Sequence, residues 1–301
     1  MKAIVLKEYG GVDQLELRDQ AAPEPKANEI QVRVAGASLN PVDWKLRSGA
    51  LKAWMPLSLP AILGRDASGV VTKVGPGVTA FAPGDRVMGL VNGGYAELVV
   101  APLDAWAKLP GGLDVVDAGA LPLVVLTGTQ LIEEATKPEA GQTVLVTGAL
   151  GGVGRAAVYA AKKRGAKVWA GVRARQRDEA RSLGADGVVA LDDADDVAKL
   201  PELDAIADTV GGPTLVKLLP KVRAGGTIGS VVGESPEAKA RGLKVHAMMA
   251  HPDGKRLGEL GEAVARGEFK IPIAKRFPLA EAREAQSLAE KGGVGKVLLT
   301  P

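Results

Sequence analysis

The sequence predicts an α/β protein in which a β-rich domain precedes a doubly wound parallel sheet. In the first hundred residues, short β patterns such as EIQVRVAGASL and ASGVVTKVG alternate with Gly and Pro turns, which is typical of a compact β-rich domain. Near Asp114 the pattern becomes helical, and from Thr143 to about His251 apolar strand patterns alternate with helical ones. That alternation indicates βαβ units in a parallel sheet. A helix over 280–291 and a last strand over 294–300 follow, and we expect this tail to pack on the first domain.

A glycine-rich segment over 144–154, VLVTGALGGVG, is the most informative part of the chain. Its glycines follow the apolar run TVLV, a helix is expected to open at Arg155, and a second apolar run, KVWAGV, comes after that helix. The backbone N–H groups of such a turn, together with the helix N-terminus, can face a pyrophosphate. The sequence therefore predicts a dinucleotide site. Its predicted contacts are Gly148, Gly151, Gly152 and Val153.

The residues after the second strand distinguish NAD from NADP. An NAD site usually places an Asp or Glu about 20 residues beyond the glycines, to bind the ribose 2′-hydroxyl. Between Glu139 and Asp178 the chain has no carboxylate, and the strand is followed by Arg173, Arg175 and Arg177. Guanidinium groups match the geometry of a 2′-phosphate, so we expect NADP(H), with Arg173 and Arg177 on that phosphate. The alternative is that these arginines form a solvated basic surface.

Composition excludes several functional classes. Among 301 residues, 38 Lys and Arg against 35 Asp and Glu give a net charge of +3, which does not require a nucleic-acid partner. The absence of cysteine excludes disulfides, thiolate nucleophiles and cysteine-ligated zinc. The N-terminus, MKAIVLKEYG, has no apolar signal core, and no run approaches the ~18 apolar residues of a membrane span. We therefore expect a cytoplasmic protein without a membrane partner.

Several motifs resemble one protein family in their order and spacing. They are ASLNPVDWKLRSG at 37–49, PAILGRDASGVV at 60–71, PGDRVMGL at 83–90, GGYAELVV at 93–100, LPLVVLTGTQLI at 121–132, the glycine-rich segment, DTVGG at 208–212 and GKVLL at 295–299. Over nearly its full length the chain resembles the zinc-independent quinone oxidoreductase branch of the medium-chain dehydrogenase/reductase superfamily. The resemblance implies a GroES-like catalytic domain over 1–120, completed by 251–301, a Rossmann NADP-binding domain over 121–250, and a homodimer.

The same resemblance argues against a catalytic metal. Asn40 stands where zinc alcohol dehydrogenases have their first Cys ligand, and Gly64-Arg65-Asp66 replaces their Gly-His-Glu. The only two histidines, His246 and His251, are too few for a usual three-ligand zinc site. Activation of a carbonyl must then come from hydrogen-bond donors or ammonium groups.

The loop NPVDWK holds the candidate catalytic residues Asn40, Asp43 and Lys45. Hydride addition to a quinone or enone places negative charge on the substrate oxygen, which a positioned donor stabilises. Lys45 suits the roles of donor and proton source, and Asp43 could orient it. The alternatives are that Lys45 is a solvated lysine and that Asn40 simply starts a turn. Trp44, Met55 and Asn92 are expected at the substrate. By resemblance, further cofactor contacts are Thr127, Thr209, Val210, Val232, Gly233 and Lys296.

Two other functions fit parts of the sequence. Tyr159 and Lys163 have the YxxxK spacing of short-chain dehydrogenases, but the tyrosine follows Gly154 by only five residues, within the first helix of the unit. A non-enzymatic nucleotide- or nucleic-acid-binding protein could also retain the fold, although the NPVDWK loop favours an enzyme. We therefore expect an NADPH-dependent, zinc-independent oxidoreductase that transfers hydride to a small apolar substrate, either a quinone or an α,β-unsaturated carbonyl.

Overall fold

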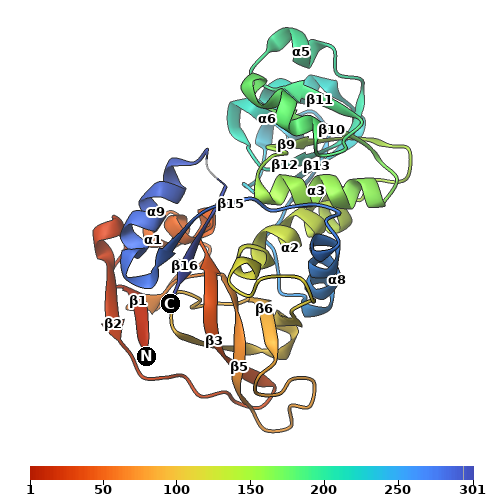
Figure 1. Ribbon diagram of the computed structural model, residues 1–301. Coiled ribbons are helices and arrows are strands. Elements are labelled where there is room, and N and C mark those ends of the chain that lie inside the picture. Colours follow the sequence, from red (N-terminus) through yellow and green to blue (C-terminus); the bar gives the residue numbers. More distant parts are fainter. Residues whose placement is uncertain (294) are drawn as a thin grey trace. The chain divides into compact units, whose positions relative to one another are not determined.

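In the computed structural model, which describes residues 1–293 and 295–301, the chain forms two separately packed units (Figure 1). The first unit consists of Met1–Leu123, Pro252–Gly267 and Ile271–Pro301, and the second of Val124–His251 and Glu268–Lys270. No helix of the described residues is long and apolar enough to cross a bilayer.

Two sheets form the first unit. A three-stranded antiparallel sheet has the order β2-β1-β4, and a larger sheet has the order β15-β16-β3-β5-β6-β8, with β7 also paired to β3. The long central strands β3 and β5 pair in antiparallel fashion, and Ile30, Val32 and Val71 lie in the core between the sheets and helices. The strands are β1 (Lys2–Leu6), β2 (Leu15–Asp19), β3 (Glu29–Ser38), β4 (Ala61–Ile62), β5 (Asp66–Val74), β6 (Arg86–Leu90), β7 (Leu98–Pro102), β8 (Trp106–Lys108), β15 (Ile273–Pro278) and β16 (Lys296–Thr300).

The C-terminal segment completes the larger sheet, because β16 pairs with β15 in parallel and with the end of β3 in antiparallel fashion (Figure 1). The predicted last strand begins at residue 294, whereas β16 begins at Lys296, and Val294 lies outside the described residues. The helices of this unit are α1 (Pro41–Arg47), α8 (Gly254–Ala265) and α9 (Ala282–Lys291), with short 3₁₀ turns η1 (Val12–Gln14), η2 (Leu103–Ala105), η3 (Asp117–Ala120) and η7 (Leu279–Glu281).

The second unit is the predicted doubly wound sheet. All six strands are parallel, in the order β11-β10-β9-β12-β13-β14, so the winding direction reverses between β9 and β12. Such a reversal is the point at which open α/β sheets bind ligands. The strands are β9 (Thr143–Thr147), β10 (Lys167–Val172), β11 (Gly187–Ala190), β12 (Leu203–Asp208), β13 (Val222–Ser230) and β14 (Lys244–Ala247).

Strand β9 is buried on both faces, as parallel strands usually are. Val144 and Val146 pack with Ala157 and Ala161 of α3, whereas Leu145 belongs to the core on the other face. Helix α2 (Pro122–Gln130) begins in the first unit and continues into the second. The other helical segments of the second unit are the π-helix η4 (Leu131–Thr136), α3 (Gly152–Lys163), η5 (Ala174–Gln176), α4 (Arg177–Arg181), α5 (Ala194–Ala198), α6 (Gly212–Leu218), η6 (Leu219–Lys221) and α7 (Pro236–Ala240).

Helix α3 begins at Gly152 and not at the expected Arg155. Gly151 is its extended N-cap, so the last two glycines of the motif already have helical geometry. The expected helix start is three residues too late, because glycine is a poor helix former in general, although it is tolerated here in the first turn.

Candidate active site

The glycine-rich loop between β9 and α3 has the geometry of a phosphate-binding turn. Gly148 has φ +60°, and the N–H of Gly151 donates to the Gly148 carbonyl at 2.9 Å. A Cβ on Gly154 would lie 2.2 Å from that same carbonyl oxygen, so only glycine lets the helix approach the loop so closely. The first N–H groups of α3, including those of Gly152 and Val153, have no partner within the helix, as at every helix start. These N–H groups and the helix dipole fit an anionic pyrophosphate.

Asp208, at the end of β12, organises the neighbouring strand ends. Its buried carboxylate accepts hydrogen bonds from the hydroxyls of Thr147 and Ser230 at 2.9 and 3.0 Å. The same Thr147 hydroxyl accepts the N–H of Thr209 at 2.8 Å, and the Thr209 hydroxyl donates to the Thr147 carbonyl at 2.7 Å. The hydrogen bonds therefore tie β9, β12 and β13 together at their carboxyl ends. Sequence reasoning missed Asp208, although a lone Asp that ends the apolar run DAIAD is a usable signal.

The residues predicted around the nicotinamide follow these strand ends. Thr209 and Val210 follow β12, while Val232 and Gly233 come after β13. Val210 and Val232 are 48% and 41% exposed, so their side chains are accessible at these strand ends. Thr127 lies on α2 and is buried.

The basic segment after β10, with Arg173, Arg175 and Arg177, contains arginines that differ in their ion pairs and exposure. Arg177 is ion-paired with Asp193 at 3.2 Å and with Asp196 at 2.6 Å. Arg173 and Arg175 are exposed, and their guanidinium groups have no ion pair with any residue in the described part of the chain. The turn itself is fixed, because the N–H of Ala174 donates to the Asp192 carboxylate at 2.7 Å.

A cluster of buried polar side chains forms around Asn40 in the first unit. The Asn40 amide nitrogen donates to Asp66 Oδ2 at 2.8 Å, and its oxygen accepts from the Lys296 ammonium at 2.6 Å. The same ammonium donates to the Leu39 carbonyl at 3.0 Å, and the Ser38 hydroxyl donates to the Asp66 carboxylate. Both ends of the Asn40 amide are thus occupied, and the residue is only 1% exposed.

Asp43 extends this cluster and caps α1. Its Oδ2 accepts from the Asn40 N–H at 2.8 Å and from the Tyr95 hydroxyl at 2.7 Å, while its Oδ1 is buried without a partner in the described structure. Burial raises the pKa of Asp43 to about 6, and the two hydrogen bonds oppose that rise only partly. Burial also raises the pKa of Tyr95 and lowers the pKa of Lys296.

The predicted catalytic residues are thus only partly brought together. Asn40 and Asp43 lie in one network, whereas Lys45 is half-buried on α1, and its ammonium has no hydrogen bond or ion pair with the described residues. The resemblance predicts Lys296 at the cofactor, but its ammonium bonds to Asn40 and Leu39. Sequence reasoning missed three members of the network, which are Ser38, Asp66 and Tyr95.

The predicted substrate residues lie on two segments of the first unit. Trp44 is on α1. Met55 lies in a later turn, where its N–H donates to the Leu51 carbonyl at 2.8 Å. Both side chains are half-buried. Asn92 is exposed after β6, and its amide oxygen accepts from Arg65 at 2.9 Å. The amide nitrogen of Asn92 forms no hydrogen bond within the described structure.

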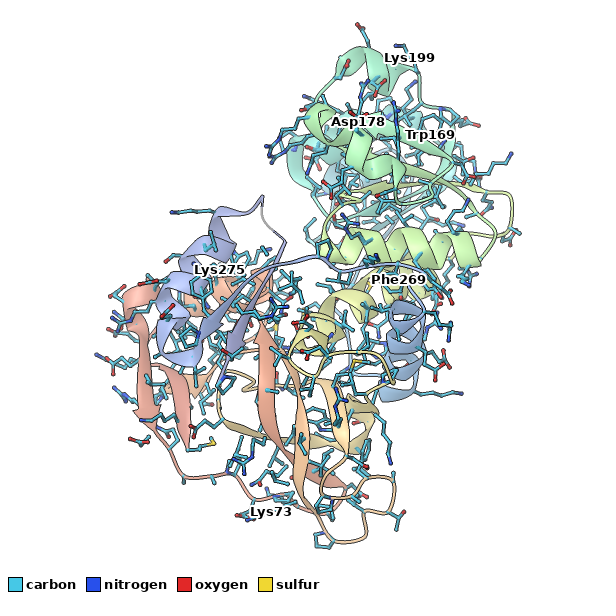
Figure 2. All side chains as sticks on the ribbon, viewed as in Figure 1. Lys73, Trp169, Asp178, Lys199, Phe269 and Lys275 are labelled. Carbon is cyan, nitrogen blue, oxygen red and sulfur yellow. The ribbon has the colours of Figure 1, made fainter. Side chains whose placement is uncertain are left out.

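The YxxxK pair on α3 has a structural explanation. The Tyr159 hydroxyl donates to Glu268 at 3.0 Å, and the Lys163 ammonium pairs with the same carboxylate at 2.8 Å. Phe269, labelled in Figure 2, stacks on the Tyr159 ring with 4.5 Å between centroids. These contacts hold residues 268–270 against α3, so the spacing that suggests a short-chain dehydrogenase serves packing here.

Comparisons with known proteins agree on the type of fold. The family description "Alcohol dehydrogenase GroES-like domain" matches residues 26–111, and "Zinc-binding dehydrogenase" matches residues 183–299. A chloroplast envelope quinone oxidoreductase homolog of Arabidopsis thaliana is 30% identical over all of this chain and 98% of its own length. An NADPH-dependent alkenal/one oxidoreductase of the same plant is 31% identical over all of this chain and 80% of its own.

Two solved structures are similar over the full chain. The quinone oxidoreductase from Coxiella burnetii has a TM-score of 0.89 and 30% identity, covering 100% of this chain and 99% of that one. A mycobacterial protein complexed with NADPH has a TM-score of 0.85 and 30% identity, covering 100% of both chains.

The zinc named in one family description does not fit the residues present. In the described ranges, 1–293 and 295–301, no group of three or more His, Cys, Asp or Glu is arranged to hold a metal ion. At the position of the expected ligands, the Asn40 amide is fully hydrogen-bonded, and Asp66 accepts from Ser38, Asn40 and the N–H of Leu123. A catalytic zinc therefore has no ligand set here.

Proposed function

The chain belongs to the quinone oxidoreductase branch of the medium-chain dehydrogenase/reductase superfamily, and on that premise we propose that it transfers hydride from NADPH to a quinone or an α,β-unsaturated carbonyl. It is an oxidoreductase with a nicotinamide dinucleotide fold. The observation that carries the proposal is full-length similarity to relatives that are named for quinone and for alkenal/one reduction.

The second unit offers a fitting site for the dinucleotide. The glycine-rich loop and the start of α3 would hold the pyrophosphate through Gly148, Gly151, Gly152 and Val153. The strand ends would hold the nicotinamide half through Thr209, Val210, Val232 and Gly233, with Thr127 from α2. When bound, the dinucleotide supplies the hydride.

We assign NADPH and not NADH from the charges beside β10. No carboxylate stands between Glu139 and Asp178 to accept a ribose hydroxyl, and the exposed guanidinium of Arg173 is available to a 2′-phosphate. Arg177 is already ion-paired with Asp193 and Asp196, so its contact with the phosphate would be weaker than that of Arg173. Two relatives support the assignment, since one is named NADPH-dependent and one is complexed with NADPH.

Lys45 is the proposed donor to the substrate oxygen. Hydride arrival at carbon pushes an electron pair onto that oxygen, and an ammonium both stabilises the negative charge and supplies a proton. Asn40 is a poor candidate for this role, because its amide N–H groups already donate hydrogen bonds to Asp66 and Ser38. We assign Asn40 and Asp43 the task of capping and positioning α1, which carries Lys45. Trp44, Met55 and Asn92 remain the proposed substrate contacts.

The domain limits 1–120 with 251–301 and 121–250, the homodimer and the cytoplasmic location stay predictions. Light scattering after size-exclusion chromatography tests the dimer, because a single species of twice 30.9 kDa is expected.

A panel assay tests the function. The loss of NADPH absorbance is followed with a benzoquinone, a naphthoquinone, an alkenal and a cyclic enone, and then with NADH in place of NADPH. We expect turnover with at least one acceptor and a higher kcat/KM for NADPH. No turnover with any acceptor would contradict the proposed function, and a preference for NADH would contradict the cofactor assignment.

A further inference from the structure

We propose that Arg155 is a positioning residue for the dinucleotide: its guanidinium holds the glycine-rich loop in the shape that receives the pyrophosphate. This inference rests on the proposed function, since it concerns the same cofactor site. Neither the motif nor the resemblance assigns a role to Arg155.

The Arg155 side chain is only 10% exposed, although it carries a charge. Its Nε donates to the carbonyl of Leu150 at 2.9 Å, which lies within the glycine-rich loop. A second guanidinium nitrogen donates to Glu179 of α4 at 2.7 Å. Arg155 thus links the loop to the helix that follows the basic segment.

The bond to Leu150 adds a second restraint to the peptide plane between Leu150 and Gly151, whose N–H is already bonded within the loop. The loop is closed by the bond from Gly151 N–H to the Gly148 carbonyl, and Gly148 and Gly151 have no side chains that could hold the backbone. Because the Leu150 carbonyl oxygen would repel a phosphate, its bond to the Arg155 guanidinium offsets part of that repulsion. The same bond fixes the loop beside the first N–H groups of α3, which have no partner within the helix.

The energetic balance at this helix start also favours an anion. A cation in the first turns of a helix is unfavourable next to the positive end of the helix dipole. Helix α3 has no acidic residue in its first turn, and the Glu179 side chain that pairs with Arg155 is 59% exposed, so solvent weakens this ion pair. A bound pyrophosphate would place further negative charge at the positive end of this helix.

The test measures binding directly, without turnover. Dissociation constants for NADPH and NADH are determined by calorimetry for the wild type, Arg155→Met and Arg155→Lys, and 2′-AMP is used as a probe that has the adenosine phosphate but no pyrophosphate. Arg164→Met is the matched control. Arg164 is the C-cap that follows the same helix, and it also donates to a backbone carbonyl, that of Pro138 at 3.0 Å, but at the far end from the loop.

We expect Arg155→Met to weaken NADPH and NADH alike, by roughly tenfold, which is the loss of one charge-assisted hydrogen bond. Binding of 2′-AMP should not change, and Arg164→Met should bind all three like the wild type. Arg155→Lys should also bind both dinucleotides more weakly, because one ammonium cannot reproduce the planar, two-directional contact of a guanidinium.

Three results would overturn the inference. The first is wild-type dinucleotide affinity in a folded Arg155→Met, and the second is a loss confined to NADPH, which would point to the 2′-phosphate. The third is wild-type affinity in Arg155→Lys, which would also decide the matter if the Met variant did not fold. If the wild type itself bound neither dinucleotide, the proposed function would fail instead, and the two failures are distinguishable.

Discussion

Replacing Asp43 by asparagine should change how the stability of the first unit depends on pH. The Asp43 carboxyl has a pKa of about 6 in the folded protein against an ordinary value of 3.8, because burial disfavours its charged form. Ionisation of Asp43 therefore costs folding free energy in full above about pH 6, and this cost disappears as the pH falls below about 4. At 1.36 kcal/mol for each pKa unit, the full cost is about 3 kcal/mol, of which about 2 kcal/mol falls between pH 4.5 and 7.5.

The variant Asp43→Asn isolates this cost from the hydrogen bonds. The introduced asparagine would keep an oxygen that accepts from the Asn40 N–H and from the Tyr95 hydroxyl, but it cannot ionise. Its amide nitrogen would take the place of the unpartnered Oδ1, which adds a penalty that is the same at both pH values. The comparison of two pH values cancels that penalty.

Urea unfolding followed by tryptophan fluorescence is a suitable assay, since Trp44, Trp54 and Trp106 of the four tryptophans belong to the first unit. Relative to the wild type, Asp43→Asn should gain about 2 kcal/mol between pH 4.5 and pH 7.5. The exposed Asp104→Asn is the control and should follow the wild type. Equal pH dependence in the Asp43 variant and the wild type would refute the argument that burial governs this carboxyl.

Three further predictions concern the chemistry. Lys45→Met should lower kcat by roughly 10²–10⁴-fold and leave NADPH affinity unchanged, because the lost interaction exists chiefly in the transition state. A kcat near that of the wild type would contradict a catalytic role and indicate that Lys45 is a solvated lysine. The double variant Arg173→Ala, Arg177→Ala should raise the KM for NADPH by roughly tenfold or more with little effect on NADH, and single variants should assign most of the effect to Arg173, since Arg177 is already ion-paired. Prolonged chelation should leave activity intact, and loss of activity that zinc alone restores would overturn the zinc-independent mechanism.

The parts of the fold that follow from local sequence were predictable. The glycine-rich turn lies between two apolar strands within about 30 residues, so β9, α3 and β10 could be placed from the sequence pattern. Asn40 and Asp43 could be grouped because they are three residues apart and form one helix cap.

The network around Asn40 shows why the rest could not be predicted. Lys296 reaches Asn40 across 256 residues of chain, because β16 pairs with the end of β3, and no local pattern encodes that pairing. Asp66 and Tyr95 join the same network from other strands and loops. Similarly, the ion pairs of Arg177 depend on how α5 packs beside β11, and charge counts along the chain do not reveal that packing.

The most direct test of the central claim is to follow the hydride itself. NADPH deuterated at C4, in each of its two stereoisomers, is oxidised by the wild-type protein in the presence of an enone, and the product is analysed by mass spectrometry. The account predicts that one stereoisomer delivers one deuterium to the carbon β to the carbonyl, while the carbonyl itself is retained. An alcohol product, or a saturated product without deuterium from either stereoisomer, would contradict direct hydride transfer to the activated alkene.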